Sequence, residues 1–293
     1  MIGLYVISRM DYNFSDDLKA IREILGITQT ELAKRIGVQQ VTLSRNELGK
    51  TEASEKLLEQ VYSFAFDNGI KLGRLKEMMW LETLKQGHKL LFHGAKSEIE
   101  GEISVNRSRT NNDFGQGFYT GESYEQAISF VSGFDHSSVY HLDFDGSGLK
   151  CKQYSVDREW MLTIAYYRGT LDEYKEHPIV QKLINETKNC DYIVAPIADN
   201  RMFQIINSFI AGEITDEQCK HCLAATNLGN QYVFTSGKAA RRLKILERSY
   251  ISSSEKEYYK GIRAGETRLG DNKVKLARRQ YRGKGKYIDD ILK

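Results

Sequence analysis

The chain has 293 residues, of which 41% are hydrophobic and 28% charged, and this balance excludes a disordered or fibrous protein. No apolar run approaches the roughly 18 residues of a membrane helix, and the stretch from residue 2 to residue 7 is too short for a secretory signal, so a cytoplasmic location is expected. The net charge of +3 is unremarkable, and two prolines in the whole chain argue against a proline-rich linker.

The first predicted elements are helices between residues 15 and 80. In the first helix, apolar side chains recur at helical spacing at Leu18, Ile21, Ile24 and Leu25. Gly26 ends that helix. Thr28 and Glu31 then form a capping-box pattern that begins the second helix. Gly37 makes a turn before a third short helix, which Gly49 ends, and two further helices with an apolar face follow.

The stretch ITQTELAKRIGVQQVTLSRNELGK resembles the Cro/repressor-type (Xre-like) helix-turn-helix family. The matching features are Thr28-Gln29, Leu32-Ala33, Gly37, Leu43-Ser44, Glu47 and Gly49. The resemblance implies a recognition helix that lies in the major groove of DNA. It also implies a homodimer, because modules of this type usually work as dimers.

On this resemblance, Gln40, Val41 and Arg45 face base edges. Glutamine can pair bidentate with adenine, and arginine with guanine. The residues expected to contact phosphates are Gln29, Ser44 and Lys50. Asn46 and Leu48 depart from the family pattern, which commonly has a bulky and a polar residue at these positions. The alternative is a helical packing module that has lost DNA binding or serves as a dimer interface.

From about residue 87 the pattern changes to short strands that interleave irregularly with helices, which favours an α+β domain. Strands are predicted at 89–94, 117–120, 138–144, 192–196 and 231–235, and helices at 159–167, 202–209 and after Ser123. From residue 238 to the last residue, 17 Lys and Arg stand against 7 Asp and Glu, a net charge of +10. Such a basic end often contacts phosphate, and a solvated helical face is the alternative.

Several familiar motifs can be excluded. The Asp-Phe-Gly tripeptide that begins at Asp113 lacks the His-Arg-Asp loop and strand lysine of a kinase. The glycines that follow it do not have dinucleotide-fold spacing, and the Gly-Lys pair at Gly237 lacks the rest of a phosphate loop. Cys219 and Cys222 are half of a zinc-site pattern without a second half, so we expect them on a helix that begins at residues 215–217, with no metal.

Three short pieces remain: LFHGA around His93, DFGQGFYTG around Tyr119, and NQYVFTSGKAARRLKIL around Gln231. Together they resemble the diphtheria-toxin-like ADP-ribosyltransferase superfamily. Residues 89–246 resemble more closely an uncharacterised bacterial domain family grouped with those transferases. Further features of that family are Gln126-Ala127, Glu159-Trp160, Ala198-Asp199 and the Gln-Tyr-x-Phe piece from Gln231 to Phe234.

The resemblance implies that NAD is the co-substrate and that His93, Tyr119 and Gln231 are the catalytic residues. The NAD-binding residues that it implies are His93, Gly94, Arg107, Arg109, Gly117, Phe118 and Tyr119. An aromatic face attracts the cationic nicotinamide ring by about 0.5–2 kcal/mol, and arginines can pair with the pyrophosphate. Gln231 stands where many transferases carry glutamate, so we expect Asp199 or Glu159 to supply a carboxylate if the fold brings either close.

The sequence therefore predicts a multi-domain α and α+β protein. The predicted domains are a helix-turn-helix bundle at 1–82, an ADP-ribosyltransferase-like split β-sandwich with helices at 88–247, and a basic helical extension at 248–293. The expected function is mono-ADP-ribosyl transfer from NAD to a protein or nucleic acid, as in a bacterial toxin or phage-defence effector, a role that rests on analogy. The alternatives are a transcription regulator that binds a nucleotide without catalysis, and an NAD glycohydrolase.

Overall fold

The computed structural model describes residues 12–225 and 228–293, so the apolar stretch at residues 2–7 lies outside the described residues. None of the described helices combines the length and the apolar character that a membrane crossing requires. The chain divides into two compact units. One unit comprises the residues up to Gly101, Ser123–Asp143 and Lys244–Ile262, and the other comprises Glu102–Glu122, Phe144–Leu243 and Arg263–Lys293. This division differs from the three consecutive domains expected from the sequence.

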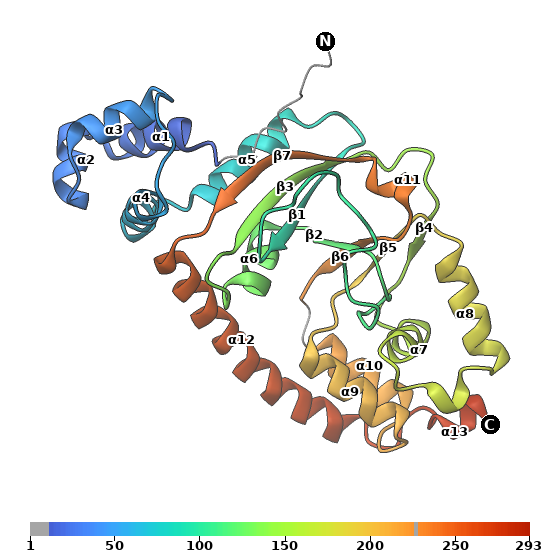
Figure 1. The fold of residues 1–293 in the computed structure, drawn as a ribbon. Helices are drawn as coiled ribbons and strands as arrows, with labels where there is room; N and C mark the ends of the chain where they lie inside the picture. The colour runs from blue at the N-terminus through green and yellow to red at the C-terminus, as the bar shows by residue number, and fades with distance from the viewer. Residues whose placement is uncertain (1–11, 226–227) are drawn as a thin grey trace, which may run out of the picture. The chain divides into compact units, whose positions relative to one another are not determined.

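The first unit begins with a helical bundle of α1 (Phe14–Leu25), α2 (Gln29–Ile36), α3 (Gln40–Glu47) and α4 (Glu55–Asp67) (Figure 1). The turns predicted at Gly26 and Gly37 are confirmed, because both glycines have positive φ angles, 61° and 72°. The capping box between Thr28 and Glu31 is also present. One prediction is wrong: Ile24 is 54% exposed and does not share the buried face of α1.

The remaining elements of this unit include α5 (Leu72–Thr83), β1 (Lys89–Ala95), α6 (Tyr124–Val131), β3 (Ser138–Phe144), most of β7 (Leu243–Tyr250) and the first turns of α12 (Ser253–Gln280). Their strands follow the order β1-β3-β7. The core side chains that hold them together are Leu90, Phe92, Tyr124, Ala127, Ile128, Val131, Val139, Ile251 and Tyr259.

A buried ionic cluster joins the helical bundle to α5 and β7. The Lys76 ammonium lies 2.7 Å from the Asp17 carboxylate on α1 and 2.5 Å from the Glu247 carboxylate on β7. The Tyr62 hydroxyl donates to Asp17 at 2.5 Å, and the Trp80 indole donates to Glu247 at 3.1 Å. Since a buried charge is tolerated only when it is paired and hydrogen-bonded, this cluster depends on all of its members.

The second unit contains β2 (Phe118–Gly121), β4 (Cys151–Gln153), β5 (Tyr192–Pro196) and β6 (Asn230–Phe234), in the order β4-β5-β6-β2. The β4–β5 pair is parallel, and the other two pairs are antiparallel. The strands of both units are assigned to one mixed seven-stranded sheet, so the split β-sandwich expected from the resemblance is not confirmed. All five predicted strands match a strand of the structure within one residue at each end, and β4 and β7 were not predicted.

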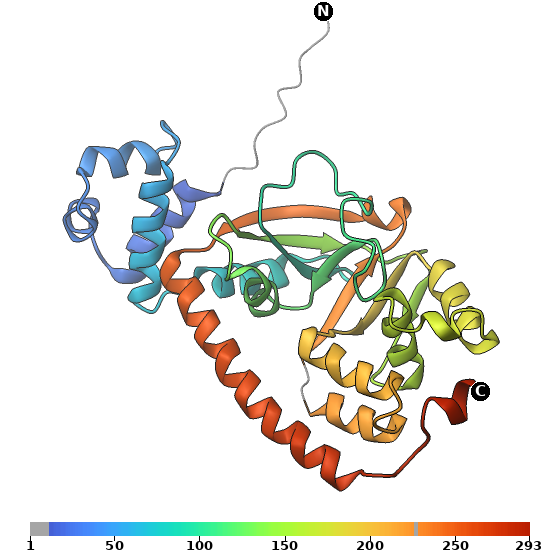
Figure 2. The same cartoon turned by 60° about the horizontal axis from the view of Figure 1, so that its bottom comes forward.

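The helices of the second unit are α7 (Arg158–Tyr167), the short 3-10 helix η1 (Asp172–Tyr174), α8 (Pro178–Lys188), α9 (Asn200–Ile210), α10 (Asp216–Ala224), α11 (Gly237–Ala240) and α13 (Asp289–Leu292). α9 and α10 lie side by side in both views (Figure 1, Figure 2). Cys219 and Cys222 are buried on α10, which begins at Asp216 with Thr215 as its N-cap, within the start predicted at residues 215–217.

The basic end of the chain packs against this pair of helices. The Gln218 amide donates to the Arg278 carbonyl at 2.5 Å, and the Lys286 amide donates to Asp216 at 2.7 Å. Near the last residues, the Tyr174 hydroxyl donates to Asp289 at 2.9 Å. Residues 263–293 of the basic end are therefore built into the second unit, and most of their charged side chains remain exposed.

Candidate nucleic-acid interface and candidate nucleotide site

The predicted base-reading residues lie on the exposed side of α3. Gln40, Val41 and Arg45 are exposed, and Val41 keeps 46% of its surface accessible although it is apolar. Of the residues predicted to contact phosphates, Lys50 is exposed and Gln29 and Ser44 are half-buried. The structure thus gathers the predicted DNA contacts on and beside one short helix.

The buried side of α3 is fixed to α1 by an ion pair. Arg22 donates to the Glu47 carboxylate through Nε at 2.9 Å and through Nη2, and its Nη1 donates to the Ile27 carbonyl at 3.2 Å. Burial raises the pKa of Glu47, but hydrogen bonds from Arg22 and Gln29 outweigh this effect and leave the pKa below its usual value. Glu47 is therefore charged in the folded protein, and it holds the third helix at a fixed angle.

A second contact orients the start of α3. The Gln40 amide nitrogen donates to the Gln29 amide oxygen at 2.7 Å, so two predicted DNA-contacting residues are coupled. Because Gln29 also hydrogen-bonds to Glu47, a polar chain runs from the buried ion pair to the exposed surface. The Gln40 side chain is consequently held in one orientation before any ligand binds.

The two departures from the family pattern have different structural outcomes. Asn46 is only 4% exposed, and its amide nitrogen donates to the Thr42 carbonyl at 2.9 Å. Its Oδ1 atom has no hydrogen-bond partner among the described residues, so burial of this amide costs stability that an apolar side chain would not lose. Leu48 is 61% exposed at the end of α3, where an apolar side chain adds surface that a polar residue would not.

The structure brings together two residues of the predicted nucleotide site. Tyr119 on β2 pairs with Val233 on β6, and Gly121 pairs with Gln231. Since side chains alternate along strands, Tyr119 and Gln231 lie on the same face as diagonal neighbours. His93 is half-buried on β1, which belongs to the other unit.

Gln231 is tied to a buried ion pair. Its amide nitrogen donates to the Asp113 carboxylate at 2.8 Å and to the Pro196 carbonyl at 3.2 Å. Asp113 also accepts from Arg168, through Nε at 2.8 Å and through Nη2, and from the Ala198 backbone amide at 3.3 Å. The carboxylate closest to Gln231 in these contacts is therefore Asp113, which the sequence analysis did not select.

The Asp-Phe-Gly-x-Gly-Phe-Tyr stretch is a hydrogen-bonded loop. The Tyr119 hydroxyl donates to the Gly115 carbonyl at 2.7 Å and accepts from the Phe114 amide at 3.1 Å. Burial raises the pKa of Tyr119 well above its ordinary value, so this hydroxyl keeps its proton. The Phe114 ring packs against Tyr154 with 5.5 Å between ring centroids. These hydrogen bonds join the end of the stretch at Tyr119 to its start at Phe114 and Gly115, and they hold Asp113 beside Arg168.

Three glycines in the predicted site have packing reasons to lack a side chain. Gly115 has a φ angle of 73°, and a Cβ atom there would lie 2.9 Å from the Tyr167 ring. At Gly117 a Cβ atom would lie 2.8 Å from the Phe234 carbonyl on β6, and at Gly94 it would lie 2.5 Å from the Ala127 carbonyl on α6. These distances are too short for any side chain, whatever ligand binds nearby.

The other predicted residues are distributed as follows. Phe118 is buried and packs against Phe234 with ring centroids 6.5 Å apart, while Arg107 and Arg109 are exposed in the loop before β2. Asp199 caps α9 by accepting from the Met202 amide at 2.8 Å. Glu159 is largely exposed on α7, 3.9 Å from Lys152. Asp199 and Glu159 therefore have structural partners of their own.

The described elements form a helix-turn-helix bundle followed in the chain by a mixed α/β region. A helix-turn-helix family model matches residues 18–61. A second family model, described as "Protein of unknown function (DUF3990)", matches residues 90–245, more than half of the chain. The chain belongs to this DUF3990 family. Comparison with curated proteins and with solved structures finds no match.

Proposed function

We propose that the chain is a sequence-specific DNA-binding regulator that reads bases through α3. The observation that carries this proposal is the exposed face formed by Gln40, Val41 and Arg45 on a helix whose opposite face is fixed by Glu47. A helix held in this way can enter the major groove without reordering. Glutamine pairs with adenine, arginine with guanine, and an apolar side chain with the thymine methyl group.

The test begins with selection of preferred sites from random duplex DNA by the purified full-length protein. On the selected site, Arg45→Ala is expected to lower affinity by about 10- to 100-fold, because a bidentate base contact contributes about 1–3 kcal/mol. Fluorescence anisotropy at fixed salt concentration measures the affinity of each variant for the selected and for a random duplex.

Arg45→Lys is the matched control, since it keeps the charge and loses the bidentate geometry. It is expected to retain affinity for random DNA and to lose most of the preference for the selected site. Failure of the selection to enrich any sequence would contradict the proposal, as would an unchanged preference in both variants.

A second candidate function is transfer of one ADP-ribose unit from NAD to a protein or nucleic acid. It is supported by the resemblance to the ADP-ribosyltransferase superfamily and by the Asp113 carboxylate, which lies 2.8 Å from the amide nitrogen of Gln231. Gln231 occupies the position at which many transferases carry glutamate. In this proposal Tyr119 stacks on the nicotinamide ring. The bond between ribose C1′ and nicotinamide breaks, nicotinamide leaves with the electron pair, and an acceptor oxygen or nitrogen bonds to C1′ and loses its proton. Because Arg168 shares the Asp113 charge, we expect slow transfer of single units.

This candidate is tested with NAD labelled in its adenylate, incubated with the full-length protein and with lysate, DNA or RNA. We expect label on a macromolecule with wild type and with the control Tyr287→Ala, and none with Tyr119→Ala. Circular dichroism establishes that each variant is folded. Free labelled ADP-ribose alone would identify an NAD glycohydrolase, and NAD binding without nicotinamide release would identify a nucleotide-sensing regulator. Absence of binding would reject NAD as the ligand.

A further inference from the structure

The strand β4 has one unpaired edge. It lies at the end of the strand order, and among residues 12–225 and 228–293 its only partner strand is β5. The Lys150 carbonyl accepts from the Asp191 amide at 2.7 Å, and the Tyr154 amide donates to the Val194 carbonyl at 2.8 Å. In a parallel pair, every second residue of a strand directs its backbone N–H and C=O groups toward the neighbouring strand. Lys150 and Tyr154 face β5 in this way, so the N–H and C=O groups of Cys151 and Gln153 point away from β5. Both residues are exposed. Such an edge is a template for an added strand.

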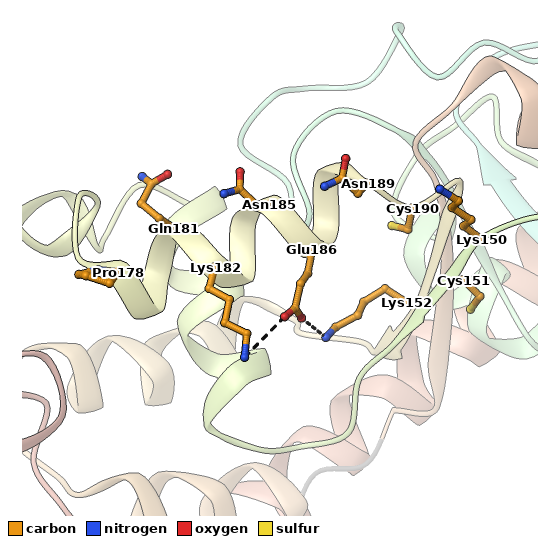
Figure 3. Close-up of a pocket in the computed structure, with 10 residues that line it drawn as sticks. All are labelled: Lys150, Cys151, Lys152, Pro178, Gln181, Lys182, Asn185, Glu186, Asn189 and Cys190. Atoms are coloured by element: carbon orange, nitrogen blue, oxygen red, sulfur yellow. Dashed lines mark hydrogen bonds and ion pairs between the residues drawn. The ribbon is translucent and has the colours of Figure 1, made fainter.

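An open groove of about 730 Å³ runs between this strand and α8 (Figure 3). The residues of α8 that line it are Pro178, Gln181, Lys182, Asn185, Glu186 and Asn189. Their spacing by three and four residues places them on one face of the helix. At 1.5 Å per residue this face is roughly 16 Å long, which matches an extended segment of about five residues.

Most residues that line the groove are polar or charged, and together they carry a net positive charge. The lining contains three lysines, Lys150, Lys152 and Lys182, and one carboxylate, that of Glu186. A hydrogen bond from Lys152, 2.5 Å long, lowers the pKa of Glu186, so this carboxylate stays charged and is already neutralised. Glu159 lies 3.9 Å from Lys152, and Glu186 also lies 3.9 Å from Lys182, whose side chain is 73% exposed (Figure 3). Because so long and exposed an ion pair is weak, Lys182 can exchange it for a ligand carboxylate, and the exposed Lys150 is the second cation that a ligand can meet. None of the lining residues is a large aliphatic or aromatic one, so an amphipathic helix would find no pocket here for its apolar side chains.

We propose that the groove binds an extended acidic segment of a partner protein, which adds to the edge of β4 as a new strand. The outward backbone groups of Cys151 and Gln153 supply main-chain hydrogen bonds, and alternate Asp or Glu side chains of the segment meet Lys150 and Lys182. The amides of Gln181, Asn185 and Asn189 line the opposite wall. This surface is independent of both the recognition helix and the Tyr119–Gln231 region.

The test uses labelled peptides that alternate Glu and Thr, with a Lys–Thr peptide of the same length as the charge control. Wild type is expected to bind the acidic peptide about ten-fold more tightly in anisotropy titrations. N-methylation of alternate peptide nitrogens is expected to abolish binding, because it removes the main-chain donors. On binding, amide hydrogen exchange within residues 150–154 slows.

Gln153→Pro is the informative variant, because it removes an outward N–H without breaking a bond to β5. It is expected to lose peptide binding, whereas the control Gln153→Ala keeps it, and Lys182→Glu weakens it at least about five-fold. Unchanged DNA binding and circular dichroism verify that these variants are folded. The proposal is overturned by the absence of saturable binding, by equal binding of both peptides, or by full binding to Gln153→Pro. Concentration-dependent dimers that Gln153→Pro abolishes would make the occupant a second copy of this chain.

Discussion

Replacing Lys76 with methionine is expected to lower the free energy of unfolding of the first unit by about 3–5 kcal/mol. Lys76 is only 5% exposed, and its ammonium is the cation shared by Asp17 and Glu247. Methionine fills a similar volume but leaves two buried carboxylates facing each other. Burial already raises the pKa of Asp17 against the attraction of Lys76. Urea unfolding followed by circular dichroism measures the effect.

Lys71→Met serves as the control, because Lys71 precedes the same helix and its contact with the Tyr258 hydroxyl is exposed. We expect a change below about 1 kcal/mol for this variant. Adding Asp17→Asn and Glu247→Gln to Lys76→Met should recover part of the lost stability, because no unpaired charge remains. Equal stability of the two methionine variants would show that the cluster is not a structural requirement.

Replacing Asp113 with alanine is expected to lower the free energy of unfolding of the second unit by about 3–5 kcal/mol. The change leaves the half-buried Arg168 guanidinium without its carboxylate, and it removes the acceptor of the Gln231 amide and of the Ala198 backbone amide. The loop that ends at Tyr119 loses its anchor at the same time. Chemical unfolding measures the loss, and nucleotide binding by the same variant shows whether the loop geometry matters for a ligand.

Asp199→Ala is the comparison for this prediction, since Asp199 caps α9 through one backbone hydrogen bond. Loss of such a cap costs about 1 kcal/mol. If Asp113→Ala is no less stable than Asp199→Ala, the Asp113–Arg168 pair contributes little. Arg168→Met, which leaves Asp113 buried and unpaired, is expected to destabilise the unit to a similar extent.

The predictions that the structure confirms depend on local signals. Thr28 and Glu31 are three residues apart, and Gly26 and Gly37 end helices through their own backbone angles, so short stretches of sequence determine these features. The ion pair between Asp113 and Arg168 joins residues 55 positions apart, and no local pattern marks it.

Two other features illustrate the same limit. The strand β4 is three residues long and gives no periodicity, so neither its unpaired edge nor the groove beside α8 was predicted. Ile24 fits the apolar spacing of α1, but the bundle leaves that side of the helix uncovered. Which apolar side chains are covered depends on the packing of neighbouring elements, and helical periodicity alone does not decide it.

The hydrogen bond between Gln29 and Gln40 couples the orientations of these two side chains. If α3 reads bases as proposed, a substitution at position 40 changes the base-reading group, and it also frees the amide of Gln29 to turn elsewhere. We therefore expect the two positions to covary among proteins that share this module. Grafting residues 40–45 alone onto another helix-turn-helix protein would transfer the side chains that are proposed to read bases, without the hydrogen bond that orients Gln40. A graft that also includes Gln29 would keep this orientation.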